Sequence, residues 1–153
     1  MNVKKKILFL CTHNAARSQM AEGFVNAHYD DRYEAYSAGS EPTEVHSCAI
    51  EVMGEEGIDI ASQHAKPLDE YLDTSFDYVV TMCAAAQERC PIFPGAIIPG
   101  GIKYIHHDFD DPLLDAGPDG VLCTSFRSVR DEVREWIEAT FVLAETATRS
   151  LQR

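Results

Sequence analysis

Residues 11–24 read CTHNAARSQMAEGF, and Cys11 is also the last residue of the continuous apolar run KILFLC at residues 6–11. Such a run is typical of a parallel strand that is covered on both faces. After a short gap, apolar side chains recur at the spacing of a helix from Met20 to Val25. The stretch therefore predicts a strand that ends at Cys11, a tight loop, and a helix that begins near Arg17.

The same alternation continues through the rest of the chain. The further expected strands cover residues 33–38, 76–82 and 102–106. The further expected helices cover residues 84–89 and 126–141, with another capped by Thr43 and ended by Gly57. Strands that alternate with helices predict an α/β fold, with a four-stranded, mostly parallel sheet and helices on both faces.

Parallel strands all end at one edge of their sheet, and ligands of such folds bind at that edge. The loops that begin at Cys11, Cys83 and His107 follow three of the expected strands. We therefore expect these loops to converge and to hold the chemistry of the protein.

Composition limits the class of protein. With 153 residues, 45% apolar composition and no long Gly, Pro or Ser tract, residues 1–153 are expected to form one domain. The net charge of −12 disfavours nucleic acid binding.

The apolar run near the N-terminus is shorter than the core of a signal peptide, and no stretch reaches the roughly 18 apolar residues of a membrane span. We therefore expect a cytoplasmic monomer with no membrane partner. In that reducing compartment, the five cysteines are expected to serve catalysis or redox chemistry and not a static disulfide framework.

The loop at residues 12–16 is expected to bind a small anion. A short loop between strand and helix turns backbone N–H groups toward an anion-sized hollow, and the planar fork of Arg17 matches a tetrahedral oxyanion. The same donors favour the thiolate of Cys11, which becomes the candidate nucleophile. Asn14 suits a left-handed backbone position, and Ser18 could donate its hydroxyl to the Cys11 sulfur. The expected anion-binding residues are Thr12, His13, Asn14, Ala15, Ala16, Arg17 and Ser18.

A plainer interpretation makes Cys11 a small buried residue and Arg17 an ordinary surface arginine. The buried strand before the loop and the amphipathic helix after it argue against that interpretation.

Five segments taken in order resemble the thioredoxin-coupled arsenate reductases, which share the low-molecular-weight tyrosine phosphatase fold. The segments are CTHNAARSQMAEGF, YSAGSEP, GIDIASQHAKPL, FDYVVTMC and FDDP. The resemblance runs from about Lys5 to Pro112 and resumes in the last helix. It implies an oxidoreductase that takes arsenate as substrate and thioredoxin as reductant, without a bound organic cofactor. The loop alone fits the phosphatases as well, so the other cysteines must discriminate.

Cys83 and Cys90 stand seven positions apart in TMCAAAQERCP. Across a helix their Cα atoms would lie about 10.5 Å apart, whereas a disulfide needs about 6.8 Å or less. The segment is short and ends at Pro91, so unwinding it should cost little. The resemblance implies that Cys11 attacks arsenate, that Cys83 attacks the Cys11 sulfur and releases arsenite, and that Cys90 takes over the disulfide for reduction by thioredoxin.

Other interpretations of the cysteines stay open. Cys83 and Cys90 could be core residues or zinc ligands, although zinc pairs are usually about two to four residues apart. Cys48 lies on the apolar stripe of its helix and is expected to be a core residue. Cys123 falls in a loop outside the resemblance and is interpreted as a packed bystander.

The segment HHDFDDP contains three carboxylates, and Asp111 before Pro112 matches the catalytic aspartate that the resemblance implies. Its role would be to protonate the departing oxygen during attack by Cys11. Without the resemblance, an Asp-Pro pair is more often only a turn. Adjacent His106 and His107 point to opposite faces of a strand, so they are interpreted as solvated residues and no metal site is expected.

The sequence also departs from the pattern of that family. His13 stands where the loop of that family usually has glycine, and Ala15 and Ala16 stand where it often has a Ser-Cys pair. Some relatives hold potassium near the loop with an asparagine, a glutamate, a serine and an aspartate. Asn14, Glu22 and Ser37 match, but Lys66-Pro67 occupies the neighbourhood of the aspartate, so we do not expect this ion.

Three functions are consistent with the sequence. The leading hypothesis is an arsenate reductase that uses Cys11, Cys83, Cys90, Arg17 and Asp111. The second is a phosphatase, because the loop and Asp111 suffice to form and hydrolyse a phosphocysteine. Leu113 stands where phosphatases normally carry a tyrosine, which argues against it. The third is a carrier that holds phosphate on cysteine, although a carrier has no use for the acid.

Overall fold

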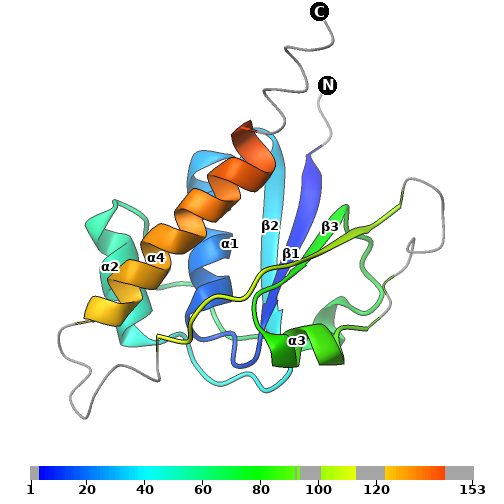
Figure 1. Cartoon of the computed structure of the whole chain (residues 1–153), viewed down its shortest axis with the longest axis horizontal. Coiled ribbons are helices and arrows are strands. Elements are labelled where there is room, and N and C mark those ends of the chain that lie inside the picture. Colours follow the sequence, from blue (N-terminus) through cyan, green and yellow to red (C-terminus); the bar gives the residue numbers. More distant parts are fainter. Residues whose placement is uncertain (1–3, 92, 94–100, 113–122, 144–153) are drawn as a thin grey trace, which may run out of the picture.

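The computed structural model describes residues 4–91, 93, 101–112 and 123–143 of the chain. Four parallel strands form one sheet in the order β2-β1-β3-β4 (Figure 1). The strands are β1 (Lys5–Cys11), β2 (Tyr33–Gly39), β3 (Tyr78–Thr81) and β4 (Lys103–His106). This confirms the expected parallel sheet, and the expected strand at residues 76–82 is shorter at both ends.

Strand β1 alternates its side chains between two cores because successive residues of a strand point to opposite faces. Ile7, Phe9 and Cys11 belong to one apolar cluster, and Leu8 and Leu10 belong to the other. All five are at most 2% exposed, so β1 is buried on both faces, as its continuous apolar run predicts.

The helices cover both faces of the sheet (Figure 1). They are α1 (Arg17–His28), α2 (Ser47–Glu55), α3 (Ala84–Arg89) and α4 (Thr124–Ile137). Helices α1, α2 and α4 pack on the face of Phe9, whereas α3 packs on the face of Leu8. Helix α4 continues into a π-helical turn at Glu138–Leu143. No helix among the described residues combines the length and the apolar character that a membrane span requires.

The prediction that Thr43 caps α2 is wrong. The helix begins at Ser47, and the ring of His46 accepts a hydrogen bond from the Cys48 backbone N–H at 3.0 Å. Thr43 lies before the helix, and its backbone N–H donates to the His13 carbonyl at 3.0 Å instead. Residues 41–46 are therefore held in an extended path by the loop after β1, and this long-range contact decides where the helix starts.

The interpretations of Cys48 and Cys123 also need correction. The two residues form a disulfide with their Cα atoms 5.4 Å apart, which joins α2 to the residue that precedes α4. Cys123 is thus not a bystander, and Cys48 does more than fill the core. Cys11, Cys83 and Cys90 are free.

Candidate active site

A chain of hydrogen bonds ends at the sulfur of Cys11. Asn14 Nδ2 donates to Ser18 Oγ at 2.7 Å, and Ser18 Oγ lies 2.8 Å from Cys11 Sγ. An amide nitrogen can only donate, so the Ser18 hydroxyl accepts from Asn14 and its own proton is available to the sulfur. All three side chains are at most 2% exposed, which strengthens each bond. The sulfur at the C-terminal end of β1 is therefore the last acceptor of this chain of hydrogen bonds.

The backbone of residues 12–16 is turned by hydrogen bonds on its outer side. The carbonyl groups of Thr12, His13 and Ala15 accept from the N–H groups of Glu41, Thr43 and His46 at 2.8–3.0 Å. In a trans peptide the carbonyl and the following N–H point in opposite directions. The N–H groups that follow these carbonyls therefore point away from residues 41–46, where an oxyanion beside Cys11 can accept from them.

Asn14 fixes the turn of this loop. Its backbone is left-handed, with φ of 52°, and its side chain is fully buried. Asn14 Oδ1 accepts from the Lys66 backbone N–H at 2.8 Å and from Gln19 Nε2 at 2.9 Å. Three parts of the chain thus meet on one side chain, and they hold the loop before any ligand arrives.

Gly39, the last residue of β2, lets that strand approach the loop. A Cβ atom there would lie 2.6 Å from the Thr12 carbonyl oxygen and 2.9 Å from the Asn14 backbone nitrogen. Both are backbone atoms that cannot swing aside. Gly39 lies outside the expected site residues, although its place directly after the buried Ser37-Ala38 pair of a strand beside β1 is a signal of close approach.

Arg17 is the first residue of α1, and its side chain is only 8% exposed. Its Nη1 donates to the Phe109 carbonyl at 3.1 Å, and its Nη2 lies 3.8 Å from Asp111 Oδ2. The guanidinium therefore links the start of α1 to the segment after β4. The structure brings the expected anion-binding arginine and the expected acid together.

Cys83 lies beside the loop at residues 12–16. It is the N-cap of α3, its Sγ lies 3.2 Å from Thr12 Oγ1, and it accepts from the Ala86 backbone N–H at 3.4 Å. Since Thr12 follows Cys11 directly, the first two sulfurs of the expected relay lie at the same edge of the sheet.

Cys90 lies at the other end of α3, which spans Ala84–Arg89 as the sequence predicts. Its thiol is half-buried and donates to the Pro91 carbonyl at 3.5 Å. Burial raises the pKa of Cys90 above its usual value. With α3 folded, Cys90 is held as a thiol and kept away from Cys83.

A buried ion pair lies behind the loop. Lys66 Nζ is 3.6 Å from Glu22 Oε1, and Ser37 Oγ donates to the same oxygen at 3.2 Å. Burial raises the pKa of Glu22, and the Lys66 ammonium opposes that shift. The residue that interrupts the potassium pattern thus places the positive charge of the protein itself against this carboxylate.

The histidines near the site make specific contacts. His13 Nδ1 donates to the Glu41 carbonyl at 3.0 Å, because a carbonyl oxygen can only accept. His106 binds Thr81 Oγ1 at 2.7 Å and Asp108 Oδ1 at 3.0 Å, whereas the ring of His107 packs on Phe109. The two adjacent histidines diverge as expected, but His106 is held by side chains and is not simply solvated.

The low molecular weight phosphotyrosine protein phosphatase family matches residues 6–151. The chain belongs to this family. It is also 41% identical over 135 residues to an arsenate reductase of Halalkalibacterium halodurans, a match that covers 88% of this chain and 94% of the relative.

Solved structures similar to this chain include arsenate reductases and a phosphatase. An arsenate reductase in the phosphate binding state has a TM-score of 0.68 and 32% identity, over 88% of this chain and 95% of its own. A thioredoxin-dependent arsenate reductase of Corynebacterium glutamicum scores 0.62 with 27% identity, over 89% of this chain and 61% of its own. An arginine phosphatase of Geobacillus stearothermophilus scores 0.70 with 26% identity, over 97% of both chains. The fold alone therefore does not distinguish reduction from hydrolysis.

Proposed function

We propose that this protein is an arsenate reductase that uses Cys11, Cys83 and Cys90 in turn and is recycled by thioredoxin. The observation that supports it most directly is the contact of Cys83 Sγ with Thr12 Oγ1 at 3.2 Å. A phosphatase needs one nucleophilic thiol at this edge of the sheet, whereas a reductase needs a second thiol that can reach it. The arsenate reductases among the relatives are consistent with this choice.

The first step is attack on the bound oxyanion. Arsenate is held by the N–H groups of residues 12–16 and by Arg17, and the Cys11 thiolate forms a bond to arsenic. One arsenate oxygen leaves as water, and Asp111 supplies a proton to it. Arg17 lies 3.8 Å from Asp111, so the group that binds the anion also positions the acid.

The second step transfers electrons. The Cys83 thiolate attacks the Cys11 sulfur, a disulfide forms between them, and the electron pair of the sulfur-arsenic bond stays on arsenic. Arsenic goes from the +5 to the +3 state and leaves as arsenite. The Ser18 hydroxyl lies 2.8 Å from the Cys11 sulfur, where it can donate a hydrogen bond to the thiolate that attacks in the first step.

The third step moves the disulfide outward. Cys90 attacks the Cys83 sulfur, and Cys11 is released as a thiolate. Helix α3 must unwind first, since its rise separates the two Cα atoms by about 10.5 Å. A dithiol of the thioredoxin class then reduces the Cys83–Cys90 disulfide, and α3 can fold again.

A phosphatase is the second candidate. The loop, Arg17 and Asp111 are sufficient for phosphocysteine chemistry, and the arginine phosphatase of similar fold supports this possibility. Weak hydrolysis of small aryl phosphates is therefore expected from the protein in addition to reduction.

One experiment separates the two functions. Arsenate-dependent NADPH oxidation is measured with thioredoxin and thioredoxin reductase for the wild type, Cys83→Ser and Cys90→Ser, and each protein is also assayed on p-nitrophenyl phosphate. We expect both variants to lose arsenate turnover and to keep phosphatase activity. Unchanged arsenate turnover in Cys90→Ser would remove Cys90 from the relay, and wild-type hydrolysis without arsenate turnover would favour the phosphatase.

A further inference from the structure

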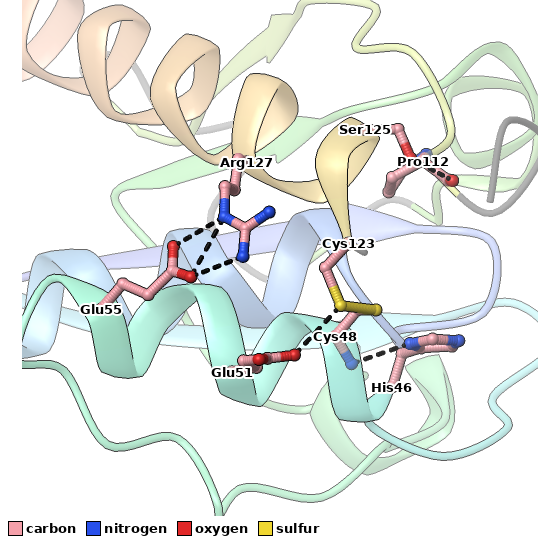
Figure 2. Close-up of a disulfide and its surroundings, with 8 residues drawn as sticks. All are labelled: His46, Cys48, Glu51, Glu55, Pro112, Cys123, Ser125 and Arg127. Carbon is pink, nitrogen blue, oxygen red and sulfur yellow. Dashed lines mark hydrogen bonds and ion pairs between the residues drawn. A yellow bond between two sulfur atoms is a disulfide. The ribbon is translucent and has the colours of Figure 1, made fainter. Parts of the chain in front are cut away.

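A second pair of cysteines lies apart from the free thiols of the proposed relay. Cys48 is in the first turn of α2, and Cys123 directly precedes α4 (Figure 2). Their disulfide closes a separation of 75 residues, and the two residues are only 3% and 6% exposed. They belong to the core on the α1, α2 and α4 face, whereas α3 packs on the opposite face.

The disulfide fixes the start of α4. Cys123 has a left-handed backbone, with φ of 51°, and Phe126 in the first turn of α4 is fully buried. The ring of Phe126 stacks on His46, the cap of α2, with centroids 4.7 Å apart. The two helix starts are thus joined by one covalent bond and one ring contact.

From this joint, a short path of contacts leads to the expected acid. Ser125 Oγ donates to the Pro112 carbonyl at 3.0 Å, as Figure 2 shows. Pro112 follows Asp111, and Asp111 lies 3.8 Å from Arg17. The first turn of α4 is therefore in direct contact with the segment that carries the carboxyl group.

We propose that the Cys48–Cys123 disulfide is a redox-sensitive lock that positions Asp111 through Ser125 and Pro112. This inference rests on the proposed function, since Asp111 acts as the acid of that reaction; the disulfide itself takes no part in the proposed electron transfer. When the lock is closed, the carboxyl group stays beside Arg17. When it is open, the start of α4 loses its covalent tie and Asp111 is placed less well for proton donation.

The lock is separated from the relay by its surroundings. Burial keeps a large dithiol protein away from both sulfurs. Glu51 Oε2 lies 3.2 Å from Cys123 Sγ, and its negative charge repels an attacking thiolate (Figure 2). Cys48 lies near the positive end of α2, which makes it the better leaving thiolate.

Closure of the lock is an ordinary thiol-disulfide exchange. Two thiols and one oxidised small disulfide, such as oxidised glutathione, give the Cys48–Cys123 bond and two reduced small thiols. Two electrons and two protons pass to the small disulfide. A small dithiol such as dithiothreitol reverses the reaction. Glu51→Gln should therefore speed opening by dithiothreitol, because the repelling charge is gone.

The state of the lock is measured first. The protein, purified without added thiol or oxidant, is denatured in the presence of an alkylating reagent, and its peptides are identified by mass spectrometry. We expect Cys11, Cys83 and Cys90 to carry the label and Cys48 and Cys123 to be linked. Full labelling of all five cysteines would overturn the proposal whether or not the enzyme reduces arsenate.

The effect on the acid is measured with two aryl phosphates. Phenol is a poorer leaving group than p-nitrophenol, so hydrolysis of phenyl phosphate depends more on proton donation. For Cys48→Ser/Cys123→Ser we expect kcat on phenyl phosphate to fall by about tenfold, with a much smaller fall on p-nitrophenyl phosphate. Inhibition by inorganic phosphate should stay the same, because the loop is intact. Ser125→Ala, which keeps the disulfide but removes the bond to Pro112, should show the same pattern more weakly.

A non-additivity test separates positioning from general loosening. In an Asp111→Asn background, opening the lock should cause no further loss on phenyl phosphate. Additive losses, equal losses on both esters, or no loss in the double cysteine variant would each overturn the proposal. If the wild type acts on neither arsenate nor aryl phosphates, the proposed function fails and the positioning role fails with it, while the labelling result still reports on the bond.

Discussion

At the scale of single residues, Gly39 lies against the backbone of the loop at residues 12–16. A Cβ atom at this position would lie 2.6 Å from the Thr12 carbonyl oxygen and 2.9 Å from the Asn14 backbone nitrogen. Gly39→Ala should therefore distort the loop and weaken the binding of phosphate or arsenate by about tenfold or more. Isothermal calorimetry measures the affinity. Gly54→Ala is the matched control, because nothing lies within 4 Å of its added methyl group, and it should leave affinity unchanged and stabilise α2 by about 1 kcal/mol. Equal affinities for the two variants would contradict this account.

Cys90 gives a prediction about pH at the same scale. Burial raises its pKa in the folded protein, so above about pH 8.5 the unfolded chain loses this proton while the folded chain keeps it. The unfolded state then binds fewer protons, and stability falls as pH rises. Urea midpoints should fall less for Cys90→Ala than for the wild type between about pH 8 and 9.5, and the two curves should be parallel below about pH 7.5. Parallel curves throughout would show that the thiol is not held in its protonated form by burial.

At the scale of elements, α3 is a helix of six residues that the proposed relay requires to unwind. Such short helices depend on tertiary contacts, and α3 has one buried alanine, Ala86, and an exposed ion pair between Arg89 and Glu41 at 3.2 Å. An ion pair of this kind adds little stability. The element is therefore suited to local opening without loss of the rest of the fold.

Gln87→Gly should make that opening easier. Gln87 is exposed in the middle of α3, and glycine there costs the helix about 1 kcal/mol. The rate of Cys83–Cys90 disulfide formation under oxidised glutathione should rise by about fivefold, since 1 kcal/mol corresponds to that factor. Gln87→Ala is the control and should slow the reaction slightly or leave it unchanged. Peptide mapping follows the rate, and equal rates for all three proteins would mean that unwinding does not limit exchange.

At the scale of the whole molecule, the Cys48–Cys123 bond restrains the unfolded chain. It closes a loop across 75 residues, which in the chain-entropy view is worth about 4 kcal/mol. Cys48→Ala/Cys123→Ala should lose about that amount in urea unfolding, with Cys83→Ser/Cys90→Ser present in both reference and variant to prevent other disulfides. A loss below about 1 kcal/mol would show that the bond is absent in solution.

The sequence by itself determined the parallel sheet, the loop after β1 and the bounds of α3. These features depend on local patterns: a continuous apolar run, helical spacing, and a proline after Cys90. It also placed Asn14 in a left-handed turn, where the structure finds it. The roles of Cys11, Cys83, Cys90, Arg17 and Asp111 remain predictions, and the expected tyrosine position at Leu113 lies outside the described residues.

Only the tertiary structure decided the start of α2, the pairing of Cys48 with Cys123 and the close contact at Gly39. Threonine is a residue type that often caps helices. The backbone N–H of Thr43 donates to the His13 carbonyl, however, and the helix begins four residues later at Ser47. Cys48 and Cys123 each fit an apolar core, and no local pattern states that 75 residues of chain bring them together. Contacts between distant segments depend on how helices pack across a sheet, and one residue's neighbours in sequence do not contain that information.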